Sequence, residues 1–155
     1  MRGNRDLARS LTTLKARYLV VNFIGLAMIA AVFVYAGVVE LLKWQMAPFT
    51  GFAKLDPGTV DLIKYIFLAL AAAQFFIIKA LQKILPAHSV EQLSLAAIIT
   101  FALCESVAVL GLVLFLLAGQ ALDFYIFMVI SLGLFYLFFP KYEQWEERVR
   151  ANNAG

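Results

Sequence analysis

The sequence predicts an all-α integral membrane protein folded as a four-helix bundle. Of its 155 residues, 63% are hydrophobic and only 15% are charged, and the mean hydropathy is +0.86. Soluble domains are less apolar, with about a quarter of their residues charged. The apolar residues fall in four long stretches separated by polar links. Stretches of this length are typical of membrane-spanning helices, which satisfy their own backbone hydrogen bonds inside a bilayer.

The four predicted spans form one transmembrane domain, residues 18–139. Their expected bounds are about 18–39, 62–81, 93–117 and 124–139. The second span is the weakest, because only the 14 residues of 65–78 lie between two lysines. Lysines at a span end can extend their ammonium groups to the interface, so the usable segment is longer.

Helix-start signals precede two of these spans. Asp56 followed by Pro57 fits the cap and first residue of the second helix. Ser89 and Gln92 match a capping box at the start of the third. Both signals favour helices that begin a few residues before the apolar stretch.

The polar ends of the chain predict its orientation. Segment 1–17 carries five cations and one acid, and its leucines recur at helical spacing, so we expect an amphipathic helix on an anionic membrane surface. Segment 140–155 is expected to be a cytoplasmic tail with a short interfacial helix. Four spans put both ends and the link 82–92 on one side. Together with Lys79, at the adjoining end of the second span, this side has ten of the 13 Lys and Arg residues. The positive-inside rule then places both termini in the cytoplasm, and we assign the protein to a bacterial cytoplasmic membrane.

Glu105 is the middle residue of the third span and the only charged residue in it. It should therefore lie near the bilayer midplane, where an ionised acid costs about 2.5–3.5 kcal/mol on insertion scales. Three outcomes stay open: protonation, a bound cation, or a polar partner. Every Lys and Arg lies at or beyond a span end. Burial without a cation favours the protonated, neutral carboxyl.

Small and aromatic residues repeat along the third span at alternating spacings of four and three. They are Ala97, Phe101, Cys104, Ala108, Gly111, Phe115 and Ala118. This coiled-coil spacing predicts a helix contact along that seam, with Glu105 at its border. Ser131, near the middle of the fourth span, is the expected partner of Glu105. Gln74 is expected nearer the cytoplasmic side, provided the hairpin is symmetric.

The run from Glu105 to Val113 resembles the ion-carrying helix of rotary ATPase proteolipids, the c-type ring subunits. The similarity covers about 62–118, with Pro86 in the short polar loop. In that family one carboxylate in the second helix of a hairpin carries a proton or sodium ion. In its sodium-binding members a serine follows the carboxylate, and a glutamine on the preceding helix helps. The resemblance implies that Glu105 is the ion carboxylate, with Ser106 and Gln74 as helpers.

Two functions stay open. In the first, the protein handles protons or sodium ions through Glu105, with Ser106, Gln74 and Ser131 as candidate ion-binding residues. In the second, it is a structural or assembly protein in which Glu105 only makes a packing hydrogen bond. A substrate transporter is a third alternative, which would require an oligomer because four spans leave little room for a pathway.

The remaining expectations concern chemistry and partners. We expect no catalytic residue, no metal site, and no cofactor other than a bound proton or sodium ion, because the sequence has no phosphate-binding loop, no Ser/His/Asp set and no paired carboxylates at catalytic spacing. The protein should not be an enzyme. The expected partners are the lipid bilayer and either further copies of the chain or a larger membrane complex. A net charge of +3 is too small to imply nucleic acid.

The orientation can be tested with reporter fusions. Fusions at Gly155 and within 82–92 should report the cytoplasm, and fusions after Gly51 and Gly119 should report the outside, because cations concentrate on the first side. An outside signal at Gly155 would contradict the four-span topology, and would point to the short second span as the one that does not cross.

Overall fold

The computed structural model describes residues 2–53, 55–84, 90–143 and 145–147. Four helices make up nearly all of this part: α1 (Arg2–Gln45), α2 (Pro57–Ile84), α3 (Val90–Ala118) and α4 (Ala121–Phe138). Each contains a stretch long and apolar enough to cross a membrane. The prediction of an all-α chain with four such helices is therefore confirmed.

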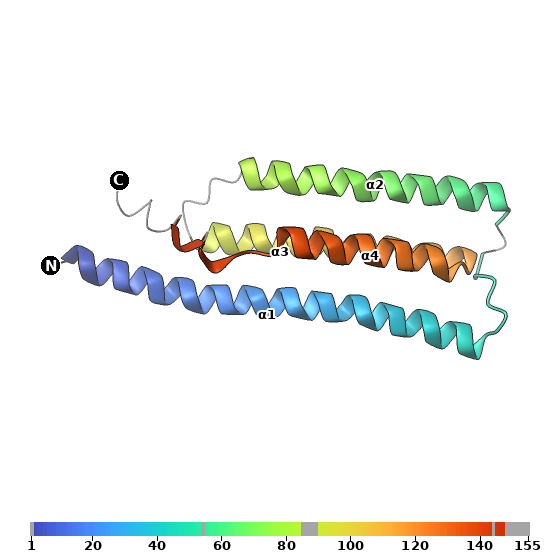
Figure 1. Cartoon of the computed structure of the whole chain (residues 1–155), viewed down its shortest axis with the longest axis horizontal. Coiled ribbons are helices and arrows are strands. Elements are labelled where there is room, and N and C mark those ends of the chain that lie inside the picture. The colour runs from blue at the N-terminus through green and yellow to red at the C-terminus, as the bar shows by residue number, and fades with distance from the viewer. Residues whose placement is uncertain (1, 54, 85–89, 144, 148–155) are drawn as a thin grey trace.

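The helices run up, down, up and down, with α3 in the centre (Figure 1). Helix α3 packs against α1, α2 and α4, and its contact with α4 is the most extensive. In the described part of the chain α1 and α2 do not touch each other. Helix α2 therefore depends mainly on α3 for its position, and α3 keeps one face uncovered between α1 and α2.

The predicted seam on α3 is buried. Phe101, Cys104, Ala108 and Phe115 are all fully inaccessible to solvent. Gly111 is buried with them, and a Cβ atom there would lie 2.5 Å from the Cβ of Phe127 on α4. The absence of a side chain at Gly111 thus lets α3 and α4 approach closely, as small residues do in membrane bundles.

The loop between α1 and α2 folds over the C-terminal end of α3. The amide of Phe52 donates to the carbonyl oxygen of Leu116 at 2.8 Å, and that of Ala53 donates to Leu117 at 3.2 Å. These bonds satisfy carbonyl groups that have no partner within the helix. Gly51 and Gly119 meet there with positive φ values of 86° and 73°, a conformation that favours glycine.

The start of α2 confirms the predicted cap. Pro57 is its first residue, and Asp56 accepts hydrogen bonds from the hydroxyl and the amide of Thr59, at 2.7 and 2.9 Å. These bonds stabilise the carboxylate and lower the pKa of Asp56. Ser89, in the capping box predicted for α3, lies outside the described residues, as does Pro86 of the link.

Both polar ends are more closely joined to the bundle than the sequence suggested. Residues 2–17 continue into the first span without a break, so α1 has 44 residues. At about 1.5 Å per residue it is roughly 66 Å long, about twice the thickness of the hydrocarbon core. At the other end, Tyr142 and Trp145 make edge-to-face contacts with Tyr18 of α1. This part of the tail therefore packs against α1.

Candidate functional site

Glu105 lies at the contact between α3 and α1. Its side chain is half-buried, and the hydroxyl of Tyr35 donates a 2.6 Å hydrogen bond to its Oε1 atom. This distance is at the short end of the normal range for O–H···O bonds. The expectation that Glu105 borders a helix contact is confirmed, and its partner is a neutral phenol from the first span.

Tyr35 was not singled out from the sequence, although a signal for it exists. Val21, Val32 and Val39 of α1 are buried, at 2%, 0% and 0% exposure. Tyr35 lies three residues after Val32 and four before Val39, so it belongs to the same heptad-like stripe. That spacing in the first span indicates a tyrosine that faces the bundle, where its hydroxyl requires a partner.

Gln74 and Ser106 join α2 to α3. The amide nitrogen Nε2 of Gln74 donates to the Ser106 hydroxyl at 2.8 Å, and this hydroxyl donates to the carbonyl oxygen of Leu103 at 2.8 Å. Gln74 Oε1 is buried and has no hydrogen-bond partner among the described residues. The two residues that the resemblance proposed as helpers are thus in contact with each other.

The depth predicted for Gln74 is wrong. We expected it nearer the cytoplasmic side than Glu105, but its contact with Ser106 puts it at the level of the residue next to Glu105. The prediction assumed a symmetric hairpin. In the structure α2 is displaced along the bundle axis relative to α3, away from the link that joins them (Figure 1).

Ser131 joins α4 to α3, but it does not donate its hydrogen bond to Glu105 as we expected. It is fully buried, and its Oγ donates to the backbone carbonyl of Cys104 at 2.7 Å. Successive residues of an α-helix point about 100° apart, so Cys104 faces α4 while Glu105 faces α1. The donor to Glu105 is therefore Tyr35, and Ser131 serves the contact between α3 and α4.

The uncovered face of α3 lies beside Glu105. Leu95, Ile99, Val109 and Val113 are 57%, 36%, 37% and 37% exposed, and their spacing puts them on one side of the helix. Ser106 lies on the same side, where Gln74 reaches it from α2. Because Glu105 is half-buried at the border of this face, its carboxyl is shielded by α1 without being sealed inside the bundle.

A buried ion pair at the end of the bundle was not predicted. Lys64 Nζ lies 2.6 Å from Asp123 Oδ1, and the two side chains are 27% and 2% exposed. The second carboxylate oxygen of Asp123 is buried without a partner among the described residues. We had placed Asp123 in the link before a fourth span beginning at 124. Helix α4 begins three residues earlier, at Ala121, so the acid lies in its first turn.

A second polar contact at this end joins α1 to α4. Glu40 accepts hydrogen bonds from Lys43, at 2.8 Å, and from the hydroxyl of Tyr125. Since Glu40 is exposed, this contact is open to solvent or to the lipid headgroups. Lys43 and Lys64 at this end thus each pair with a carboxylate, and none of the described ion pairs includes Glu105.

Glu105 and its neighbours present oxygen atoms that can bind a proton, a hydrogen-bond donor or a simple cation. The described residues contain no group of three or more His, Cys, Asp or Glu side chains that could hold a metal ion. No protein-family model, curated protein or solved structure matches the chain.

The Lys64–Asp123 pair generates a stability prediction. Asp123→Asn should lower the free energy of unfolding by about 1–3 kcal/mol, because it leaves the Lys64 ammonium without a counter-charge. The effect stays below that of a fully buried pair because Lys64 is partly exposed. The double variant Lys64→Met/Asp123→Leu should recover most of this loss. Reversible unfolding in mixed micelles measures both. Lys43→Met, which breaks an exposed pair, is the control and should cost under about 1 kcal/mol. Equal effects of Asp123→Asn and Lys43→Met would contradict the buried pair.

Proposed function

We propose that the protein is an ion-handling membrane protein in which Glu105 binds and releases a proton or, in its place, a sodium ion. One observation carries this proposal: a half-buried carboxyl at mid-helix has a neutral hydroxyl, Tyr35, as its hydrogen-bond donor. No described Lys or Arg forms an ion pair with it. Charge in the hydrocarbon region is costly, so a bound proton or cation must compensate the carboxylate.

The neighbouring residues support a role in binding. The Tyr35 hydroxyl can accept a hydrogen bond or coordinate a cation with its lone pairs while it stays in contact with Glu105. The next residue, Ser106, accepts a hydrogen bond from Gln74 at about the same depth, and no donor among the described residues reaches the amide oxygen of Gln74. Hydroxyl, carboxylate and amide oxygens are the ligands that hard cations prefer. The resemblance to rotary ATPase proteolipids selects Glu105, Ser106 and Gln74 independently.

The position of Glu105 supports exchange of its ion. The exposed face of α3 beside it is apolar, and a second copy of the chain or a larger membrane complex could cover that face. We propose that the protein works in such an assembly in the bacterial cytoplasmic membrane, with both termini in the cytoplasm. An isolated four-helix bundle offers no continuous polar route, whereas an interface at this face would bring a partner to the carboxyl.

A structural or assembly role is the second candidate, and the polar contacts between helices favour it. Tyr35–Glu105 joins α1 to α3, Gln74–Ser106 joins α2 to α3, and the Ser131 hydroxyl joins α4 to α3. In this role Glu105 would only hold α1 in place. The two candidates differ in one requirement: ion handling needs a group that titrates, whereas packing needs only a hydrogen-bond acceptor.

Modification by a carbodiimide distinguishes them. A hydrophobic carbodiimide reacts with protonated carboxyls in apolar surroundings, so it should label Glu105 at low pH, and high pH should protect the residue. Protection by sodium at constant pH would identify sodium as the ion. Peptide mass mapping locates the label. Glu105→Gln should abolish it, and Asp123→Asn, which removes the other buried acid, should not.

Two outcomes would contradict ion handling. One is an unreactive Glu105 at every pH. The other is a Glu105→Gln variant that supports growth and assembly like the parent protein, because glutamine keeps the hydrogen bond to Tyr35 but does not titrate. The second outcome would favour the structural role.

A further inference from the structure

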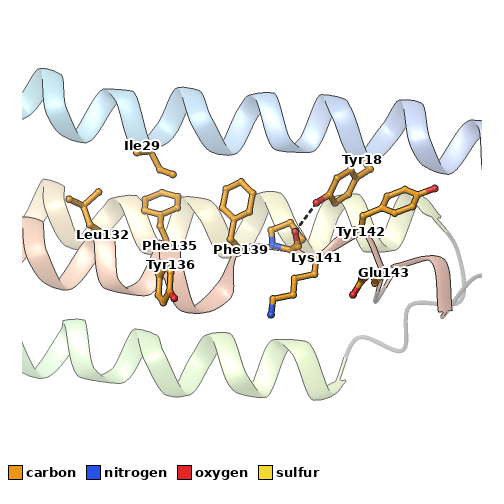
Figure 2. A pocket seen from close by; sticks show the side chains of 10 residues that line it. Tyr18, Ile29, Leu132, Phe135, Tyr136, Phe139, Lys141, Tyr142 and Glu143 are labelled. Atoms are coloured by element: carbon orange, nitrogen blue, oxygen red, sulfur yellow. Dashed lines mark hydrogen bonds between the residues drawn. The ribbon is translucent and has the colours of Figure 1, made fainter.

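A groove of about 710 Å³ lies between α1 and α4, toward the end of the bundle at which α4 terminates (Figure 2). Its inner wall consists of Ile29 of α1, Leu132 and Phe135 of α4, and Phe139, which directly follows α4. The rings of Phe135 and Phe139 point toward α1 and rest on Phe101 of α3, with ring centroids 5.9 and 5.3 Å from it. The volume suits a ligand-sized apolar group.

The groove changes from apolar to polar along its length. From Leu132 to Phe139 it runs for about 10 Å along the helix axis, roughly a third of the hydrocarbon thickness. Beyond Phe139 the lining consists of Pro140 and then Lys141, Tyr142 and Glu143. Such a gradient matches an amphiphile, whose tail enters the hydrocarbon while its head stays at the interface.

Aromatic residues close the polar end. Tyr18 donates a hydrogen bond to the carbonyl oxygen of Pro140 at 3.1 Å, and its ring packs edge-to-face on Tyr142 and Trp145. Tyr136, 87% exposed, lies on the outer rim. Tyrosine and tryptophan are typical of the membrane–water boundary. These aromatic residues therefore close the groove at its polar end, and the groove opens laterally, between α1 and α4, toward the surrounding lipid.

The mouth presents two opposite charges. Lys141 and Glu143 are both exposed, and in Figure 2 their side chains leave the chain in the same direction. Neither belongs to an ion pair among the described residues, whereas Lys43, Lys64 and Arg17 each have a carboxylate partner. A cation and an anion two residues apart complement a headgroup that carries both a phosphate and an ammonium group.

We propose that this groove binds one zwitterionic phospholipid with a primary-amine headgroup, taken from the surrounding bilayer. One acyl chain lies between Ile29 and Phe135, the ammonium of Lys141 contacts the phosphate, and the carboxylate of Glu143 accepts hydrogen bonds from the lipid amine. An anionic lipid would face Glu143 unfavourably, and a choline headgroup has no N–H to donate. The proposal is independent of the role of Glu105.

Native mass spectrometry of the purified protein tests it. The protein is mixed with equal amounts of phosphatidylethanolamine, phosphatidylcholine and phosphatidylglycerol that have identical acyl chains. We expect one ethanolamine lipid to predominate in the bound fraction. Glu143→Gln should reduce the preference for ethanolamine over choline about twofold to fivefold, the range of an exposed ion pair. Lys141→Gln should reduce the bound fraction of all three lipids by a similar factor.

Substitutions in the wall test the position of the lipid. Leu132→Trp should fill the groove and remove the bound lipid, whereas Val129→Trp, on the same helix at a 69% exposed position outside the lining, should not. Thermal unfolding of each variant verifies the fold. Equal lipid binding by Leu132→Trp and the parent protein would overturn the location. Binding that ignores the headgroup in both the parent and Glu143→Gln would overturn the specificity.

Discussion

A carboxyl group in the middle of a membrane-spanning helix must be neutralised or hydrogen-bonded, because the hydrocarbon region supplies neither water nor counter-ions. The central helix α3 carries such a group at Glu105, and the arrangement around it meets this constraint. Helix α1 runs alongside α3 and brings the Tyr35 hydroxyl within 2.6 Å of the carboxyl. The parallel packing of α1 on α3 is thus tied to one polar contact near mid-helix.

The packing around α3 explains why this contact can form. Glycines on both sides of the contacts with α3 allow close approach. Gly111 of α3 accommodates Phe127 of α4, and a Cβ at Gly25 of α1 would lie 2.7 Å from the ring of Phe101 on α3. Without a strong hydrophobic driving force between helices in lipid, such close contacts and interhelical hydrogen bonds hold a bundle together. Helix α2 packs less extensively on the bundle than α1 does, and two polar contacts fix it: Gln74 to Ser106 on α3 and Lys64 to Asp123 on α4.

Periodicity and hydropathy predicted the features that depend on one helix at a time. The four apolar helices, the buried seam from Phe101 to Phe115 and the Asp56 cap all follow from local patterns, and the structure contains each of them. What periodicity cannot supply is the shift of one helix along another. That shift brought Gln74 level with Ser106, and an expectation built on a symmetric hairpin missed it.

The missed partners have physical explanations of the same kind. Tyr35 lies near the end of an apolar stretch, where a tyrosine could equally lie at the lipid–water boundary. Only its helical spacing from Val32 and Val39 indicates that its side chain faces the bundle. Hydropathy placed the start of the fourth span at residue 124, three residues after α4 begins, so Asp123 was assigned to the preceding link. Its partner Lys64 was interpreted as a lysine reaching for the interface, whereas it forms an ion pair with a nearly inaccessible acid. An ion pair between two helices cannot be predicted from the pattern of either helix alone, because it depends on how the helices pack together.

We propose that Glu105 carries a proton, held in contact with Tyr35, when no cation is bound. Infrared difference spectroscopy of the protein reconstituted in lipid tests it directly. We expect a protonated-carboxyl C=O band that persists at pH 7, vanishes in Glu105→Gln and moves to higher wavenumber in Tyr35→Phe, because the lost hydrogen bond stiffens the carbonyl. Absence of this band at pH 7, both with and without sodium, would show an ionised, solvated Glu105 and contradict the account.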